Sequence, residues 1–206
     1  MTAPTTGPTV PNHHGGLPGF SGASGLLAGL TMAFGRGDVA RLAAELAGVG
    51  PGRQVVDVGC GPGTAARLAA ERGATVSGVD PAPVMLRLAR WLTRRSTTVT
   101  WIEGAAASLP LDDASADAVW SIATVHHWPD VTAGLSEVRR VLADGGTFLA
   151  IERRTRAGAR GLASHGWTDG RAMAFAAACR AAGFDPVSVE RHRSRRSTHV
   201  VVAAIR

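Results

Sequence analysis

Short apolar blocks alternate with longer amphipathic blocks along most of the chain. The apolar blocks have the length of buried strands and cover residues 55–58, 75–79, 99–103, 118–125 and 147–151. In the amphipathic blocks apolar residues recur at helical spacing, as Val39, Leu42 and Leu46 do, and this predicts helices over residues 38–48, 64–72, 83–94, 131–142 and 169–182. Strands that alternate with helices form a mainly parallel sheet with right-handed crossovers.

The two ends of the chain depart from this alternation. Residues 186–190 and 198–205 have the pattern of two strands with no helix between them, so we expect an antiparallel hairpin at one edge of the sheet. The first two dozen residues are rich in Pro, Gly, Thr and Ser. We therefore expect an irregular or mobile arm over residues 1–35 and one domain over residues 36–206.

Composition and charge narrow the class of protein. The chain has 206 residues, of which 45% are hydrophobic and 18% charged, as is typical of one soluble globular domain. The net charge of +6 comes from arginines in scattered doublets, which does not favour a nucleic-acid partner. Two cysteines make no disulfide framework, and the apolar run 26–34 is too short to span a membrane. We expect a cytoplasmic protein, and the sequence leaves its oligomeric state open.

A glycine-rich loop directly follows the first predicted strand. Gly59, Gly61 and Gly63 permit a sharp turn and the close approach of a ligand to the backbone. The helix that begins near Thr64 directs its positive end at this ligand, which favours an anionic group such as a carboxylate. Asp80 ends the second strand, where its carboxylate can accept hydrogen bonds from both hydroxyls of a ribose.

Two kinds of ligand compete for this loop. A nicotinamide dinucleotide is bound by the spacing G-x-G-x-x-G, whereas this loop has the spacing G-x-G-x-G with Thr64 in the sixth place. Asp57, two residues before the first glycine, places a carboxylate where a pyrophosphate is disfavoured and an ammonium group is favoured. A ligand that carries both an ammonium and a carboxylate group fits both features.

The segment Val-Val-Asp-Val-Gly-Cys-Gly-Pro-Gly-Thr at residues 55–64 resembles the first motif of the class I S-adenosylmethionine-dependent methyltransferases. The resemblance continues in the family's order through residues 109–112, 117–119, 125–130 and 137–146. Together these segments resemble the small-molecule branch that includes the ubiquinone-biosynthesis methyltransferases. It implies a Rossmann-like three-layer α/β sandwich with a seven-stranded sheet. It also implies S-adenosylmethionine as cofactor and a small molecule as methyl acceptor.

The resemblance also implies which residues bind the cofactor. The three glycines would contact the methionine part and Asp80 the ribose. The family commonly carries an acid after the third strand that contacts the adenine amino group, and Ala105 stands at that position here. Apolar contacts and backbone would then hold the adenine. The expected cofactor-binding residues are Asp57, Gly59, Cys60, Gly61, Gly63, Asp80, Pro81, Ala105 and Ala106.

The methyl acceptor is expected at the carboxyl ends of the fourth and fifth strands. Histidine is the natural general base near neutral pH, so His126 and His127, which follow the fourth strand, are the catalytic candidates, although a structural role is open for each. The expected acceptor contacts are Trp128, Arg153, Arg154 and His165. The arginines favour an anionic acceptor. The remaining histidines show no metal-ligand spacing with cysteines or acids, and we expect no metal.

Two other functions remain open. The positive charge suggests a nucleic-acid methyltransferase, although residues 121–124 lack the Asp/Asn-Pro-Pro-aromatic signature of adenine-N6 enzymes. The substitution at Ala105 suggests a protein that binds the cofactor without turnover. For each of these functions, as for a small-molecule methyltransferase, the N-terminal arm with Phe20 and Phe34 is the expected cover of the site.

Overall fold

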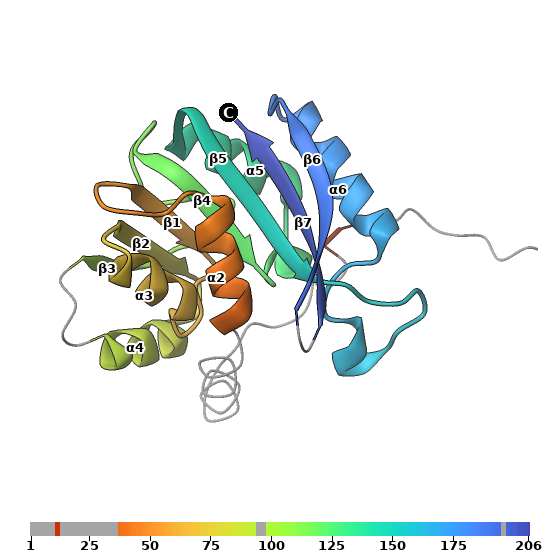
Figure 1. The fold of residues 1–206 in the computed structure, drawn as a ribbon, viewed down its shortest axis with the longest axis horizontal. Coiled ribbons are helices and arrows are strands. Elements are labelled where there is room, and N and C mark those ends of the chain that lie inside the picture. The colour runs from red at the N-terminus through yellow and green to blue at the C-terminus, as the bar shows by residue number, and fades with distance from the viewer. Residues whose placement is uncertain (1–10, 13–36, 94–97, 195–196) are drawn as a thin grey trace, which may run out of the picture.

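The computed structural model describes residues 11–12, 37–93, 98–194 and 197–206. The predicted arm and its two phenylalanines therefore lie almost wholly outside the described residues. The described part forms one sheet between two layers of helices (Figure 1). None of its helices has the length and hydropathy needed to cross a membrane.

The sheet has seven strands in the order β3-β2-β1-β4-β5-β7-β6. The pairs that join β1 to β2 and β4, β2 to β3, and β4 to β5 are parallel, whereas β7 runs antiparallel to both β5 and β6. This confirms the predicted parallel sheet and its antiparallel hairpin. The strands are β1 Gln54–Val58, β2 Thr75–Asp80, β3 Val99–Glu103, β4 Ala116–Ile122, β5 Leu142–Arg153, β6 Val187–Arg193 and β7 Thr198–Ile205.

The helices cover the two faces because side chains alternate along each strand. Val55 packs in a core with the first helices, whereas its neighbour Val56 packs in a second core with the later ones. Helices α2 and α3 thus cover one face and α5 and α6 the other, while α4 lies beside β3 (Figure 1). The helices are α2 Gly37–Leu46, α3 Thr64–Glu71, α4 Pro83–Leu92, α5 Val131–Val141 and α6 Asp169–Ala181, and the short 3-10 helices are η1 Val125–His127 and η2 Gly161–Ser164.

Several strand boundaries differ from the sequence-based prediction, and two of these differences have a clear cause in the backbone. Strand β4 ends at Ile122 rather than at residue 125, because Ala123 takes a left-handed conformation with φ of 56° that a strand does not accommodate. Strand β5 begins at Leu142 rather than at residue 147, because Leu142 pairs with Ala116 before a register shift. The first difference lies at the end of β4 that leads to His126, whereas the second lies at the opposite end of the strand.

Candidate functional site

The glycine loop joins β1 to α3 and is attached to both neighbouring strands. The backbone amides of Gly59 and Cys60 donate hydrogen bonds to the carbonyl of Val79 in β2, at 2.8 and 3.1 Å. On the other side, a Cβ atom added at Gly59 would lie 2.6 Å from Cγ2 of Thr124, in the loop after β4. Gly59 therefore allows the loop after β4 to pack directly on the glycine loop.

Gly63 provides space for a side chain of the protein itself. A Cβ atom at Gly63 would lie 2.1 Å from Cη2 of Trp101, and one at Gly78 would lie 2.4 Å from Cζ3 of the same ring. Trp101 projects from β3, and its Nε1 donates a 3.0 Å hydrogen bond to the hydroxyl of Thr93. The indole is thus held between two glycines, and this packing accounts for Gly63 without a ligand.

A pocket opens at the carboxyl end of β1, beside the first residues of α3. Asp57 lies in its wall and is only 2% exposed. Gly63 occupies the N-cap position of α3 and offers no side chain to cap the helix amides. The pocket therefore fits a ligand that carries an ammonium group and a carboxylate. The ammonium group would bind Asp57, and the carboxylate would bind the amides at the N-terminus of α3. The lining residues are Val39, Ala40, Asp57, Gly59, Cys60, Pro62, Thr64, Ala65 and Ile122.

Cys60 lies in this pocket but is not suited to act as a nucleophile. Its burial raises the pKa of the thiol well above its ordinary value, and the carboxylates of Asp57 and Asp80 raise it further. The thiol therefore stays protonated and neutral near pH 7.

Asp80 connects the end of β2 to the glycine loop. Its Oδ2 accepts a 2.8 Å hydrogen bond from the amide of Gly61, and its Oδ1 accepts one of 2.8 Å from the amide of Ala82. Each carboxylate oxygen can accept a second hydrogen bond, which leaves capacity for ribose hydroxyls. Burial raises the pKa of Asp80, and the two amide hydrogen bonds only partly oppose that effect.

We expect Asp80→Asn to weaken binding of S-adenosylhomocysteine by about 1.5–3 kcal/mol, because one charged acceptor pair is lost. When the pH is lowered, Asp80 takes up a proton, and the affinity of the unchanged protein for S-adenosylhomocysteine should decrease. Because the pKa of Asp80 is raised, this decrease should begin at a higher pH than for an ordinary aspartate. Calorimetric titration across pH measures both effects. The exposed Asp112→Asn variant is the control, and equal affinities of the two variants would contradict this role.

The segment after β3 supplies the expected adenine contacts. Asp80 and Glu103 are register partners, so the residues that follow each strand lie at the same edge of the sheet. Ala105 is exposed and forms an isolated bridge with Ser108, whereas Ala106 is half-buried against the core. This placement keeps Ala105 and Ala106 as proposed contacts, with no carboxylate at Ala105.

A buried histidine–carboxylate pair lies at the carboxyl ends of β4 and β5. Nδ1 of His126 lies 2.9 and 2.8 Å from the two carboxylate oxygens of Glu152. The side chains are 2% and 0% exposed. Glu152 was not identified from the sequence because it follows an apolar run, Leu149–Ile151, within one strand. The register of Ile122 with Ile151 brings it beside the loop that carries His126.

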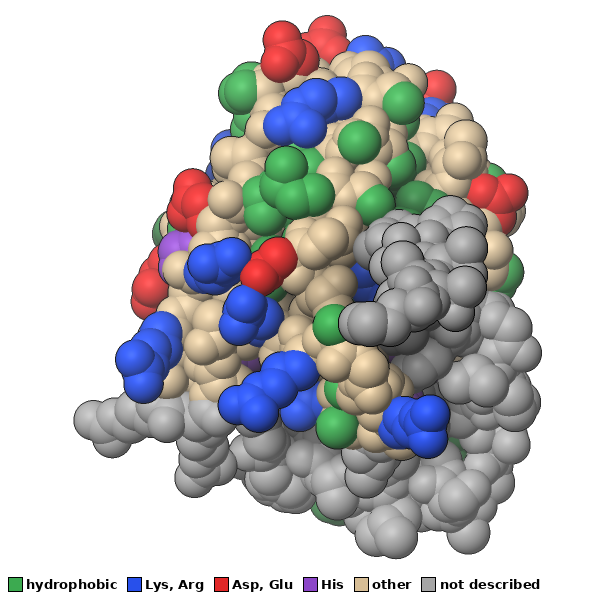
Figure 2. All heavy atoms as spheres, turned by 90° about the vertical axis from the view of Figure 1, so that its right-hand side faces the viewer, with side chains coloured by type: hydrophobic (Ala, Val, Ile, Leu, Met, Phe, Trp, Pro, Cys, Tyr) green, Lys and Arg blue, Asp and Glu red, His purple; other side chains and the backbone are tan. Residues whose placement is uncertain are grey.

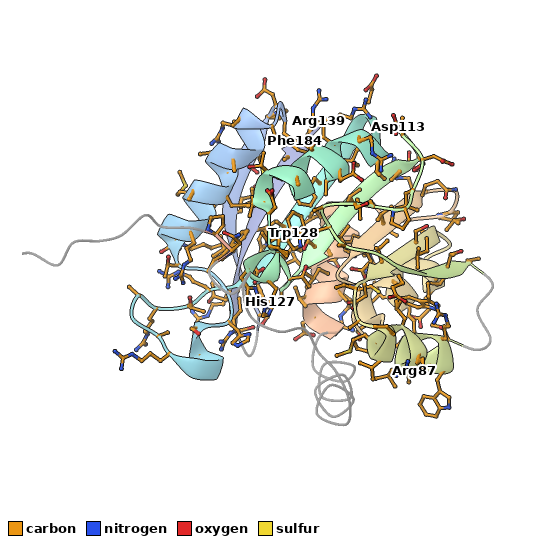
Figure 3. The ribbon with its side chains drawn as sticks, turned by 180° about the vertical axis from the view of Figure 1, so that it is seen from behind. Arg87, Asp113, His127, Trp128, Arg139 and Phe184 are labelled. Carbon is orange, nitrogen blue, oxygen red and sulfur yellow. The ribbon has the colours of Figure 1, made fainter. Side chains whose placement is uncertain are left out.

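His127 and His165 complete a cluster of three imidazoles with His126. The ring centroids are 4.2 Å apart for His126 and His127, and 5.5 Å for each of these with His165. Arg153 positions the segment that carries His165, because its Nε and Nη2 donate to the His165 carbonyl at 3.2 and 3.1 Å. Figure 3 shows His127 at the end of the sheet opposite Asp113 and Arg139.

Two predicted acceptor contacts have other partners in the structure. Trp128 is buried against Gly134, where an added Cβ would lie 2.6 Å from its Cε3, and it packs on Phe175. Arg154 donates to both carboxylate oxygens of Asp169, at 3.0 and 2.6 Å. The ion pair lowers the pKa of Asp169 to about 2. These contacts favour structural roles for Trp128 and Arg154.

Comparisons with known proteins agree with this geometry. The chain matches the model of a methyltransferase domain over residues 56–150. It is 35% identical over 112 residues to a demethylmenaquinone methyltransferase of Tropheryma whipplei, covering 54% of this chain and 46% of that protein. It is 38% identical over 99 residues to a malonyl-[acyl-carrier protein] O-methyltransferase of Serratia marcescens, covering 48% and 38%. The chain thus spans less than half the length of these relatives.

Solved structures of similar fold extend the match beyond those residues. A SAM-dependent methyltransferase of Aquifex aeolicus superposes with a TM-score of 0.74 at 16% identity, covering 88% of this chain and 98% of that one. One from Mesorhizobium loti gives a TM-score of 0.67 at 25% identity, covering 84% and 100%. The matched residues, the glycine loop with its following acid and the order of the seven strands agree with one another, and residues 56–150 form a methyltransferase domain of the class I S-adenosylmethionine-dependent type.

Proposed function

We propose that this chain transfers the methyl group of S-adenosylmethionine to a small-molecule acceptor bound beside His126. The buried pair of His126 and Glu152 carries this proposal. It lies at the same edge of the sheet as Asp57 and Asp80, and the loop that leads to it packs on Gly59. Open α/β sheets bind their ligands at this edge.

The residues of the glycine loop would hold the cofactor by its charged groups and its ribose. Asp57 would face the ammonium group, the amides at the start of α3 the carboxylate, and Asp80 the ribose hydroxyls. When bound, the cofactor supplies an electrophilic methyl group on a sulfonium. The protein's part is then to align the acceptor and exclude water.

His126 has the surroundings of a general base. A carboxylate only accepts hydrogen bonds, so the ring donates from Nδ1 to Glu152, and Nε2 is the atom that takes a proton from an acceptor. Glu152 fixes this tautomer and stabilises the positive charge that the ring gains. The pair thus suits an acceptor whose hydroxyl must lose its proton during transfer.

The names of similar proteins support a small molecule as acceptor. One relative is a demethylmenaquinone methyltransferase, and another, from Synechocystis, is a 2-methyl-6-phytyl-1,4-hydroquinone methyltransferase, 35% identical over 107 residues. The test is a screen of hydroxyl, thiol, amine and nucleic-acid acceptors with methyl-labelled S-adenosylmethionine. Label in a small molecule supports the proposal, whereas label in RNA or DNA alone would replace it with a nucleic-acid methyltransferase. Cofactor binding without any transfer would favour a protein that has lost turnover.

The charge of the acceptor is a further part of this proposal. Arginines gather in the lower half of the face in Figure 2. Arg154 is neutralised by Asp169, whereas Arg156 and Arg160 are exposed and, among the described residues, have no ion pair. They follow β5 in the connection that leads to His165. They therefore support an acceptor that carries a carboxylate or phosphate.

We expect Arg156→Glu with Arg160→Glu to raise KM for an anionic acceptor roughly tenfold, because two attractive charges become repulsive. The matched control is Arg72→Glu with Arg87→Glu, which makes the same change in net charge on α4 and beside α3. Steady-state kinetics at low and high salt measures the difference. A KM that changes equally in both double variants, or that is independent of salt, would contradict an anionic acceptor.

A further inference from the structure

The three histidines beside the fourth and fifth strands have a geometry that suits a metal ion. One ring nitrogen from each of His126, His127 and His165 lies within 4.8 Å of those of the other two. Around a tetrahedral zinc ion with Zn–N distances of about 2.0–2.1 Å, such nitrogens are about 3.4 Å apart. Metal binding would therefore require the half-buried His127 and His165 side chains to move closer to the buried His126.

Glu152 gives the cluster the second feature of a metal site. Histidine ligands of metals commonly donate their other ring N–H to a carboxylate, which fixes the tautomer and raises the basicity of the ligating nitrogen. Nδ1 of His126 has this partner in Glu152, at 2.8 Å. The buried carboxylate also supplies a negative charge beside the three imidazole rings, and this charge would partly balance that of a bound divalent cation.

We propose that His126, His127 and His165 bind one divalent transition metal ion of the zinc type. Three imidazoles leave a fourth position open to water or to an oxygen of a bound molecule. Imidazole ligands select zinc and its neighbours over magnesium or calcium. This inference departs from the sequence-based expectation of no metal, since His165 is 38 residues from His127 and only the fold brings them together.

The metal site shares His126 with the proposed general base and so bears on the proposed function. A nitrogen that ligates a metal ion cannot also take a proton. Zn²⁺ should therefore inhibit methyl transfer by the metal-free protein if His126 is the base. Activation by Zn²⁺ would support the metal site and overturn the role of His126 as general base. The failure of the metal site can thus be distinguished from the failure of the general-base proposal.

The test measures metal binding by the full chain without an affinity tag and without acceptor. Zn²⁺ is titrated against a chromophoric chelator, and Co²⁺ is added separately to record the visible absorption of a tetrahedral site. We expect one ion per chain. His165→Ala should abolish measurable binding, and Glu152→Gln should lower Zn²⁺ affinity about 10- to 100-fold, as loss of such a carboxylate does at metal sites.

Control variants separate this cluster from other histidines of the chain. His192→Ala removes a histidine that lies on β6 beside Glu190, and His13→Ala with His14→Ala removes a pair outside the described residues. Both controls should bind Zn²⁺ as the unchanged protein does. Binding of S-adenosylhomocysteine by each variant checks that it is folded. Absence of Zn²⁺ binding in the unchanged protein, or its loss only in a control variant, would overturn the proposal.

Discussion

Replacement of His126 by Asn should lower kcat about 100- to 10,000-fold, the contribution typical of a positioned general base. The Asn amide can still donate to Glu152, so the buried carboxylate keeps a partner and the fold is preserved. The variant has no basic ring nitrogen that can take the proton from the hydroxyl of the methyl acceptor. Affinity for S-adenosylhomocysteine should be unchanged, because the residues proposed to bind it lie in the glycine loop and at Asp80.

His127→Asn is the matched control, since it makes the same change at the adjacent, half-buried ring. It should affect kcat much less. Glu152→Gln should lower kcat at least about tenfold with little change in KM, because Glu152 acts by positioning His126. Equal losses in the two histidine variants, or a rate near that of the unchanged protein for His126→Asn, would return His126 to a structural role.

Replacement of Gly63 by Ala should lower the free energy of unfolding by about 2–5 kcal/mol. The added Cβ would lie 2.1 Å from the Trp101 ring. Overpacking of this kind costs about 1–3 kcal/mol. Gly63 also has φ of 78°, and a left-handed conformation costs a non-glycine residue about 1–2 kcal/mol more. Urea denaturation followed by circular dichroism measures the total.

Gly61→Ala separates these two effects. Gly61 has φ of 54°, also left-handed, but no atom lies within 4 Å of an added Cβ. Its variant should therefore lose only the backbone part, about 1–2 kcal/mol. Trp101→Leu combined with Gly63→Ala should recover part of the packing loss. Equal losses in the two glycine variants would show that the Trp101 ring moves aside at no cost.

Much of the fold follows from local sequence features. The alternation of apolar strands with amphipathic helices, and the absence of a helix between the last two strands, were enough to predict a mainly parallel sheet with an antiparallel hairpin at one edge. The order of the strands within the sheet was not predicted. The glycine loop and Asp80 were found because they lie at the carboxyl ends of predicted strands and carry residue types with specific conformational or chemical properties. Signals of this kind are contained within a few adjacent residues.

The remaining parts of the site depend on contacts between distant segments. Glu152 looks like the polar end of an apolar strand, and only its register beside β4 reveals its contact with His126. The role of Gly63 depends on Trp101, which comes from another strand. Arg154 appeared available to a ligand, but Asp169 at the start of α6 neutralises it. Sequence spacing carries no information about such pairings.

The loop between β1 and α3 is expected to bind S-adenosylmethionine rather than a nicotinamide dinucleotide. The most direct test is calorimetric titration of the full chain with S-adenosylhomocysteine, repeated in the presence of NADH as competitor. We predict one S-adenosylhomocysteine per chain, with an affinity that saturating NADH leaves unchanged. Binding of NADH at the same site, or no binding of S-adenosylhomocysteine by the folded protein, would contradict this account.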